Sequence, residues 1–333
     1  MTNKIFIIAE AGVNHNGDIN LAKKLIDAAA TAGVDAVKFQ TWKTELLVTE
    51  DAKMADYQVQ NTQREETQFE MLKRLELSYS DFSELKTYCD DRNIQFMSTP
   101  DEEQSATFLN GLQPIFKIGS GELTNTPFLR HIANFGKPVI LSTGMGYLSE
   151  VEHAISTLQD AGLCLDMITV LHATTDYPTV PEDVNLRSMQ TIANAFPGIT
   201  VGYSDHTLGI EIPVAAVALG AKVIEKHFTL DKAMSGPDHK ASLEPQELVA
   251  MVQAIRNIEL ALGNGWKVPT HTEKANRNIV RKSLVASKDI IMGSPITADM
   301  LEIKRPGNGI PPTRWDEVIG SIAKKDYQKG ELI

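Results

Sequence analysis

One stretch, Ile199–Leu230, constrains the fold of this chain most strongly: it reads ITVGYSDHTLGIEIPVAAVALGAKVIEKHFTL. Two short apolar runs flank an Ala/Val/Leu-rich segment, a pattern typical of a strand, a helix and a second, parallel strand. Each predicted strand ends in polar residues, Ser204, Asp205 and His206 on the first and Glu225, Lys226 and His227 on the second. Parallel strands of such a unit end at the same sheet edge, so we expect His206 and His227 to lie side by side. Two neutral imidazoles so placed predict a divalent metal site.

The same alternation recurs along the chain. Apolar runs predict strands at 5–10, 34–40, 94–99, 115–120, 138–143, 167–173, 199–204 and 221–228. Helices are predicted at 20–32, 68–75, 80–92, 102–111, 126–135, 149–161, 185–195, 208–219 and 245–262, with Gly33 ending the first and Ser80 capping the third. Eight strand–helix units in this length favour a (β/α)₈ barrel. A doubly wound sheet is the alternative, but AGVNHNGD after the first strand lacks a Gly-rich phosphate-binding motif.

The rest of the chain has a different character. Residues 43–66 show no clear period and predict a long loop, and GPDH at 236–239 predicts a turn or a segment folded over the site. We predict a catalytic barrel over 1–262, a polar linker over 263–279 and a small β-rich domain over 280–333. A domain of that size is marginally stable alone and is expected to pack on the barrel or on another subunit.

Composition excludes several classes of function. The net charge of −11 argues against a nucleic-acid or anionic-membrane surface, either of which requires a basic face. The two cysteines are too few for a disulfide framework. No apolar run is long enough to cross a membrane or to form a signal peptide, so a cytoplasmic location is expected.

Polar residues at predicted strand ends mark the expected active site, because this end of a barrel carries the catalytic residues. Lys38 and Lys117 interrupt apolar strands, where an unpaired ammonium is costly. With Thr99, Ser120, Ser142 and Ser204 they predict a cationic, hydroxyl-rich site for a phosphorylated acid. Gln40, Glu122 and Tyr177 suit a sugar, and His172 is a candidate third metal ligand or a support for the other two.

The motifs AEAGVNHNG, VKFQTWK, KIGSGE, LSTGM, GYSDHT, IEKHFTLDK, SGPDHKASLEP and KRPGNGI resemble, in order and over nearly the whole chain, the sialic acid (nonulosonate) synthase family. The resemblance implies a barrel enzyme that condenses phosphoenolpyruvate with an N-acetylmannosamine-type sugar and releases phosphate. It also implies a C-terminal antifreeze-like (SAF) domain and a homodimer in which each tail caps the partner's barrel.

The resemblance also implies roles for single residues. His206 and His227 would bind Mn²⁺ or Mg²⁺. Phosphoenolpyruvate would be held by Lys38, Thr99, Lys117, Ser120, Ser142, Thr175 and Ser204, and the sugar by Gln40, Glu122, Tyr177 and Arg305. Asp101 departs from the family pattern, since an aromatic residue is expected after STP, and it brings a negative charge near the anion site.

We predict a metal-assisted condensation in which Glu10 or Glu225 stabilises the cation or takes the proton of the attacking water. The sequence favours N-acetylmannosamine as the sugar and N-acetylneuraminate as the product. A 2,4-diacetamido-trideoxy hexose, giving a legionaminate- or pseudaminate-type product, is the alternative. A Schiff-base pyruvate aldolase, a metal hydrolase and a non-enzymatic sugar- or ice-binding module are more distant ones.

Overall fold

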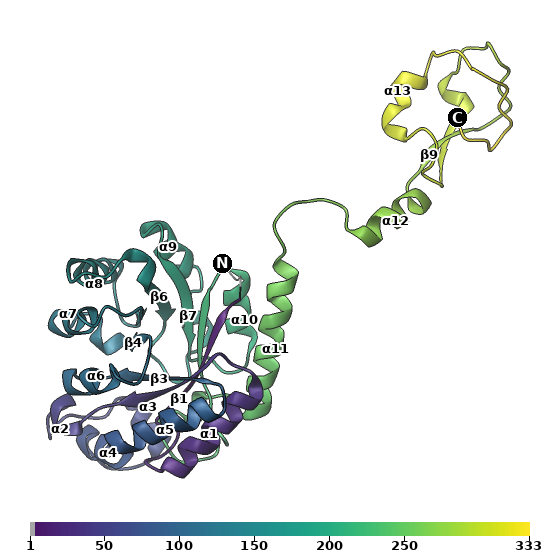
Figure 1. Ribbon diagram of the computed structural model, residues 1–333. Helices are drawn as coiled ribbons and strands as arrows, with labels where there is room; N and C mark the ends of the chain where they lie inside the picture. The colour runs from purple at the N-terminus through teal and green to yellow at the C-terminus, as the bar shows by residue number, and fades with distance from the viewer. Residues whose placement is uncertain (1–3) are drawn as a thin grey trace. The chain divides into compact units, whose positions relative to one another are not determined.

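A computed structural model describes residues 4–333 of the chain. The chain divides between residues 263 and 264 into two compact units, and each is described by itself. The ribbon diagram shows the first unit as strands enclosed by helices (Figure 1).

The first unit contains eight parallel strands. They are β1 (Phe6–Gly12), β2 (Ala36–Thr41), β3 (Gln95–Pro100), β4 (Phe116–Ile118), β5 (Val139–Ser142), β6 (Ile168–Ala173), β7 (Thr200–Asp205) and β8 (Val223–His227). Their hydrogen-bonded order is β3-β2-β1-β8-β7-β6-β5-β4, and the backbones of the two end strands, β3 and β4, also approach each other. The predicted (β/α)₈ barrel is therefore confirmed, as a nearly closed barrel.

Helices follow the strands around the barrel. They are α1 (Ile19–Ala32), α2 (Thr44–Leu47), α3 (Asp56–Thr62), α4 (Gln68–Leu75), α5 (Tyr79–Asp91), α6 (Glu103–Leu109), α7 (Thr126–Ala133), α8 (Leu148–Asp160), α9 (Ser188–Ala195), α10 (Glu211–Ala218) and α11 (Pro245–Leu262). Gly33 ends α1 in the left-handed conformation predicted for it.

Two predictions about helices are wrong. The cap of α5 is Ser78, not Ser80, because Ser78 accepts a hydrogen bond from the amide of Asp81 and its own amide donates to the Asp81 carboxylate. Residues 43–66 are not a plain loop, since they include α2 and α3. Hydrogen bonds from the Asn61 side chain to the carbonyls of Tyr177 and Pro237 hold α3 to the loops after β6 and β8.

The barrel interior changes from apolar to polar along the strands. A layer of buried apolar side chains lies on the N-terminal side of the polar residues along the strands. It is formed by Ile8, Ala36, Met97, Ile140, Leu171 and Val223. Alternate residues of a strand face the same side, so the residue two positions further on also faces inward. Those residues include Glu10, Lys38, Thr99, Ser142 and Glu225. The apolar layer therefore closes the barrel beneath a polar cavity.

The second unit is small and rich in short β structure. β9 (Ser283–Ala286) pairs antiparallel with β10 (Leu301–Lys304), and isolated bridges add further pairings. Its core is built on Leu284, Ala286, Ile290, Ile296 and Leu301. The short helix α13 (Trp315–Val318) packs beside it, and α12 (His271–Val280) forms where the sequence predicts a polar linker. Thr270 caps α12 in a capping box with Glu273, a local signal that the linker prediction missed.

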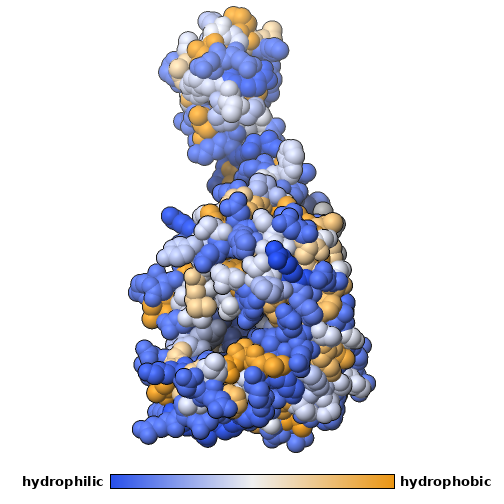
Figure 2. Space-filling view, turned by 90° about the vertical axis from the view of Figure 1, so that its left-hand side faces the viewer, coloured by the Kyte–Doolittle hydropathy of each residue, from blue (hydrophilic) through white to orange (hydrophobic). Residues whose placement is uncertain are grey.

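Figure 2 shows hydrophobic residues in separate patches between hydrophilic ones on the face in view. Within residues 4–333, no helix combines the length and the apolar character that a membrane crossing requires.

Candidate active site

Neighbouring strands bring two carboxylates and two lysines together inside the barrel. Glu10 pairs in register with Lys38 on β2 and with His227 on β8. Lys38 Nζ lies 2.8 Å from Glu10 Oε2 and 3.8 Å from Glu225 Oε2. Lys117 Nζ lies 3.6 Å from Glu225 Oε1. All four side chains are at most 6% exposed, so each charge depends on its neighbours rather than on water.

Hydroxyl groups complete this cluster. Lys38 donates a hydrogen bond of 2.8 Å to Thr99 Oγ1, and Ser204 donates one of 3.0 Å to Glu225 Oε1. The Ser142 hydroxyl is buried without a hydrogen-bond partner among the described residues. A buried hydroxyl normally finds a partner, so Ser142 is free to bind a ligand in the cavity.

Burial and charge separate the two carboxylates. Burial raises the pKa of Glu10 to about 8, so this group exchanges its proton near neutral pH. Burial acts in the same direction on Glu225, but the charges of Lys117 and Lys38 outweigh it and lower its pKa. Burial alone would lower the pKa of Lys38, whereas Glu10 and Glu225 raise it, and the pKa of Lys117 is lowered by burial. Glu225 is thus a fixed negative charge and Glu10 a proton-exchanging group.

The two predicted metal-binding histidines are neighbours, with ring centroids 5.3 Å apart. His206 Nδ1 lies 2.6 Å from the Thr174 carbonyl, which can only accept, so Nδ1 carries the proton and Nε2 keeps a free lone pair. His227 Nδ1 is buried without a hydrogen-bond partner and lies 3.9 Å from Asp238 Oδ2. Burial lowers the pKa of both imidazoles, that of His227 strongly. Both rings are therefore neutral at pH 7, the form that binds metals.

The donor set fits a divalent metal ion in part. Both imidazoles are neutral, and His227 Nδ1 has no hydrogen-bond partner among the described residues. A ligand between the two rings would supply that partner. Among residues 4–333, no three His, Cys, Asp or Glu side chains are arranged to hold an ion by themselves. An ion bound here would need substrate or water to complete its coordination.

The predicted site residues converge on one cavity of about 190 Å³. Thirteen of them line it: Glu10, Lys38, Gln40, Thr99, Lys117, Ser120, Ser142, Thr175, Tyr177, Ser204, His206, Glu225 and His227. Asp101 and Met145 line it as well. This cavity is the candidate active site and is called the catalytic cavity below.

Three predicted residues lie elsewhere. Glu122 binds the Asn125 amide and lines a neighbouring cavity, because the single 3₁₀ turn Ser120–Glu122 turns it away from Ser120. Arg305 belongs to the second unit, which is described by itself. His172 does not line this cavity, and its Nε2 lies 2.7 Å from the Val184 carbonyl.

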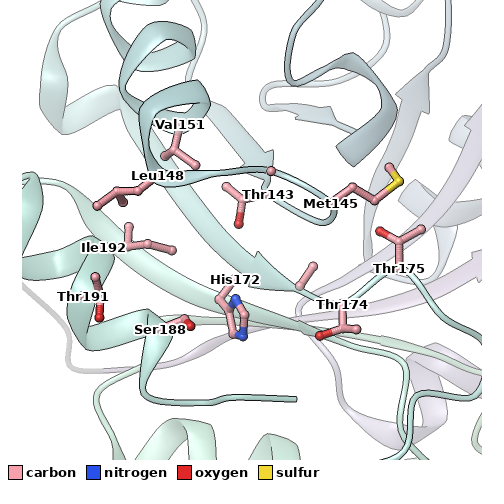
Figure 3. Close-up of a pocket in the computed structure, with 12 residues that line it drawn as sticks. Thr143, Met145, Leu148, Val151, His172, Thr174, Thr175, Ser188, Thr191 and Ile192 are labelled. Atoms are coloured by element: carbon pink, nitrogen blue, oxygen red, sulfur yellow. The ribbon is translucent and has the colours of Figure 1, made fainter. Parts of the chain in front are cut away.

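His172 lines a larger cavity of about 420 Å³ between the β5–α8 and β6–α9 connections. Figure 3 shows aliphatic side chains at one end of this cavity and hydroxyl groups around His172. Met145 and Thr175 line both this cavity and the catalytic cavity. Met145 has a φ of 64°, a conformation that non-glycine residues seldom adopt.

Sequence reasoning missed several contacts of the site. The Tyr57 ring on α3 stacks on Tyr177 at 5.0 Å, and Tyr177 packs on His206 at 4.1 Å. Lys226 and Asp205 form a fully buried ion pair 2.5 Å apart, next in sequence to the two histidines. A lysine inside the apolar run of β8 is a detectable signal for that pair, whereas residues 43–66 carry no period that could reveal Tyr57.

Known proteins share this fold and sequence. The chain is 53% identical over 331 residues to N,N'-diacetyllegionaminic acid synthase of Campylobacter jejuni, covering 99% of each. It is 48% identical to the protein of the same name in Legionella pneumophila, covering 98% of this chain and 93% of that one. The crystal structure of the N-acetylneuraminic acid synthetase from Leptospira borgpetersenii is 36% identical and matches with a TM-score of 0.72, covering 82% of this chain and 90% of that one.

The relatives are named synthases, and the predicted enzyme class, a phosphoenolpyruvate-dependent transferase that forms a carbon–carbon bond, is confirmed. The NeuB family model matches residues 25–267, and the SAF domain model matches residues 281–333. The predicted resemblance is confirmed: the chain belongs to the NeuB family and carries a SAF domain.

Proposed function

We propose that this protein condenses phosphoenolpyruvate with a 2,4-diacetamido-2,4,6-trideoxy hexose to give a legionaminate-type nine-carbon keto acid and phosphate. The observation that carries the choice of sugar is the high identity, 53% and 48%, to two N,N'-diacetyllegionaminic acid synthases. The sequence alone favours N-acetylmannosamine, and the relatives support the alternative sugar better.

Phosphoenolpyruvate fits the side of the cavity that carries the lysines. Lys38 and Lys117 supply positive charge, and Thr99, Ser120, Ser142, Thr175 and Ser204 supply hydroxyl donors around them. The unpartnered Ser142 hydroxyl supports this assignment. Binding of the anionic donor would offset the ammonium groups that now contact Glu10 and Glu225.

The acceptor sugar would lie against Gln40 and Tyr177 at the mouth of the same cavity. The stack of Tyr57 on Tyr177 fixes the phenol ring, so the wall against the sugar is preorganised. By the resemblance, Arg305 of one protomer would reach the sugar in the partner's barrel, in a domain-swapped homodimer.

His206 and His227 would hold Mn²⁺ or Mg²⁺. A bound ion of this kind acts as a Lewis acid toward the sugar aldehyde. The hydrogen bond from His206 to the Thr174 carbonyl fixes one ring orientation, and the contact of Tyr177 with both rings fixes the wall beside them.

In the reaction, C3 of phosphoenolpyruvate forms a bond to the aldehyde carbon, and positive charge develops at C2. Glu225, kept ionised by two lysines, is the negative charge that stabilises this cation. Water adds at C2, the Glu10 carboxylate takes one of its protons, and that proton passes to the alkoxide formed from the aldehyde. The new C2 hydroxyl then gives its proton to the departing phosphate as the C2–O bond to phosphate breaks, which leaves the C2 ketone. Lys38 Nζ lies 2.8 Å from Glu10 Oε2, so its positive charge stabilises the Glu10 carboxylate whenever this group has given up its proton.

Phosphate release tests this proposal. The purified protein is incubated with phosphoenolpyruvate and either sugar, with Mn²⁺, with Mg²⁺ and after chelation. We expect metal-dependent release with the diacetamido sugar and a product mass equal to the sum of both substrates and water minus phosphoric acid. Release with N-acetylmannosamine but not with the diacetamido sugar would contradict this proposal and indicate N-acetylneuraminate as the product.

A further inference from the structure

Beside the catalytic cavity lies a second, acidic cavity of about 390 Å³, the side cavity, lined by Leu46, Leu47, Asp101, Glu102, Glu103, Gln104, Glu122, Asn125 and Phe128. Asp101 also lines the catalytic cavity, directly beyond the C-terminal end of β3. The two cavities therefore share a wall, and Asp101 is that wall.

The carboxylates of the side cavity differ in how they are used. Glu102 caps α6, since its oxygens accept hydrogen bonds from Gln104, from the Ser105 amide and from the Ser105 hydroxyl. Glu122 accepts from Asn125. The Asp101 backbone is held by a hydrogen bond of 3.1 Å from its amide to the Thr41 carbonyl. Burial and the charge of Glu122 raise the pKa of Asp101 to about 7, and no hydrogen bond to its side chain contributes among the described residues.

Charge decides which substrate group can face this wall. Phosphoenolpyruvate carries a phosphate and a carboxylate, and the ionised forms of Asp101 and Glu122 repel both groups. A hydroxyl or an amide N–H donates to a carboxylate, and such charge-assisted bonds are strong. A hydrogen-bond donor of the acceptor sugar therefore suits this wall better than either charged group of phosphoenolpyruvate does.

Part of the lining of the side cavity is apolar. Phe128 is buried, Leu47 half-buried and Leu46 half exposed, and all three line the same space. A ligand group that fits must combine a polar N–H with an apolar end. An acetamido group has this chemistry: its N–H can face Asp101 while its methyl group lies on the leucines.

We propose that Asp101 and the side cavity form the subsite for the second acetamido group of the acceptor sugar, and that Asp101 determines specificity for a diacetamido sugar over N-acetylmannosamine. This inference rests on the proposed function and adds the residue that selects the sugar. It also explains why a carboxylate is tolerated near the anion site, since its partner is the other substrate.

The test is steady-state phosphate release by the full-length wild type, Asp101→Ala and Leu46→Asp, varying each sugar and phosphoenolpyruvate separately. Glu152→Ala, an exposed carboxylate on α8, is the matched control. We expect Asp101→Ala to lower kcat/KM for the diacetamido sugar at least tenfold, the value of a lost hydrogen bond to a charged group. Leu46→Asp should lower it about fourfold through lost methyl burial. KM for phosphoenolpyruvate should stay within about twofold in both variants, and Glu152→Ala should match wild type.

The outcomes are distinguishable. If wild type uses only N-acetylmannosamine, or neither sugar, the proposed function fails and this inference fails with it. If wild type uses the diacetamido sugar but Asp101→Ala loses activity through KM for phosphoenolpyruvate, the subsite is wrong and Asp101 belongs to the donor site. Equal losses with both sugars would also overturn the inference, and melting curves of each variant separate lost specificity from lost folding.

Discussion

The catalytic cavity and the larger cavity beside it are neighbours with opposite chemistry. The larger one, about 420 Å³, is lined by hydroxyl, aliphatic and imidazole side chains, and none of its described lining residues is charged. The catalytic cavity has less than half that volume, about 190 Å³, yet it contains two lysines, three carboxylates and two neutral histidines. Volume alone would not select the cavity that contains the buried charges. What distinguishes the catalytic one is a set of buried charges that no purely structural role requires.

The largest difference between the two cavities is expected when one histidine is removed from each. His227→Ala should lower kcat about a thousandfold or more, because it deletes one of two candidate metal ligands. His172→Ala should lower it only a few-fold, since that ring bonds the Val184 carbonyl in the larger cavity. Phosphate release, with Mn²⁺ binding measured by calorimetry, checks both variants. Equal losses would show that the larger cavity takes part in the chemistry.

Glu10→Gln tests the buried charges themselves. We expect kcat to fall about a hundredfold, the usual contribution of a positioned proton-transfer group. The pKa of Glu10 in the folded state, about 8, lies above its ordinary value of 4.5. Glu10 therefore supports folding below about pH 4.5, and this contribution is lost as the pH rises towards 8. The variant should show a flatter stability profile over that window in urea unfolding, and a profile parallel to wild type would contradict the assignment.

The next prediction concerns the boundary between the catalytic cavity and the larger cavity. Gly144 donates a hydrogen bond of 2.9 Å from its amide to Ser120 Oγ. A Cβ at this position would lie 2.1 Å from Thr175 Oγ1 and 2.8 Å from Ser120 Oγ. Gly144→Ala should therefore displace both hydroxyls and raise KM for phosphoenolpyruvate about tenfold, at a stability cost of about 1–3 kcal/mol. Gly111→Ala, with its nearest neighbour at 3.8 Å, is the control and should leave KM unchanged.

The smallest effect is expected in the larger cavity alone. Thr191→Val removes one hydroxyl from its lining and leaves the catalytic cavity untouched. Because Thr191 is exposed, we expect kcat and KM within about twofold of wild type and a stability change below about 0.5 kcal/mol. A loss above tenfold in steady-state turnover would give the larger cavity a role in substrate binding or product release.

Local sequence patterns account for the barrel and for most of the candidate site. Strand periodicity places Glu10, Lys38 and Thr99 two residues beyond Ile8, Ala36 and Met97, so the apolar layer and the polar cavity above it follow from an alternation that is local to each strand. The position of His206 and His227 at neighbouring strand ends follows in the same way. The N-terminal end of α12 is also encoded locally, by the capping box of Thr270 and Glu273.

The positions of the connecting segments depend on contacts between distant parts of the chain. Tyr57 reaches Tyr177, and Asn61 reaches Pro237, across more than a hundred residues of sequence, so no local pattern could predict α3 at the site. Glu122 faces the side cavity rather than the catalytic cavity because one 3₁₀ turn redirects it. Strand ends are fixed by hydrogen-bonded register, which local sequence encodes, whereas loops are fixed by contacts that exist only after the barrel has closed.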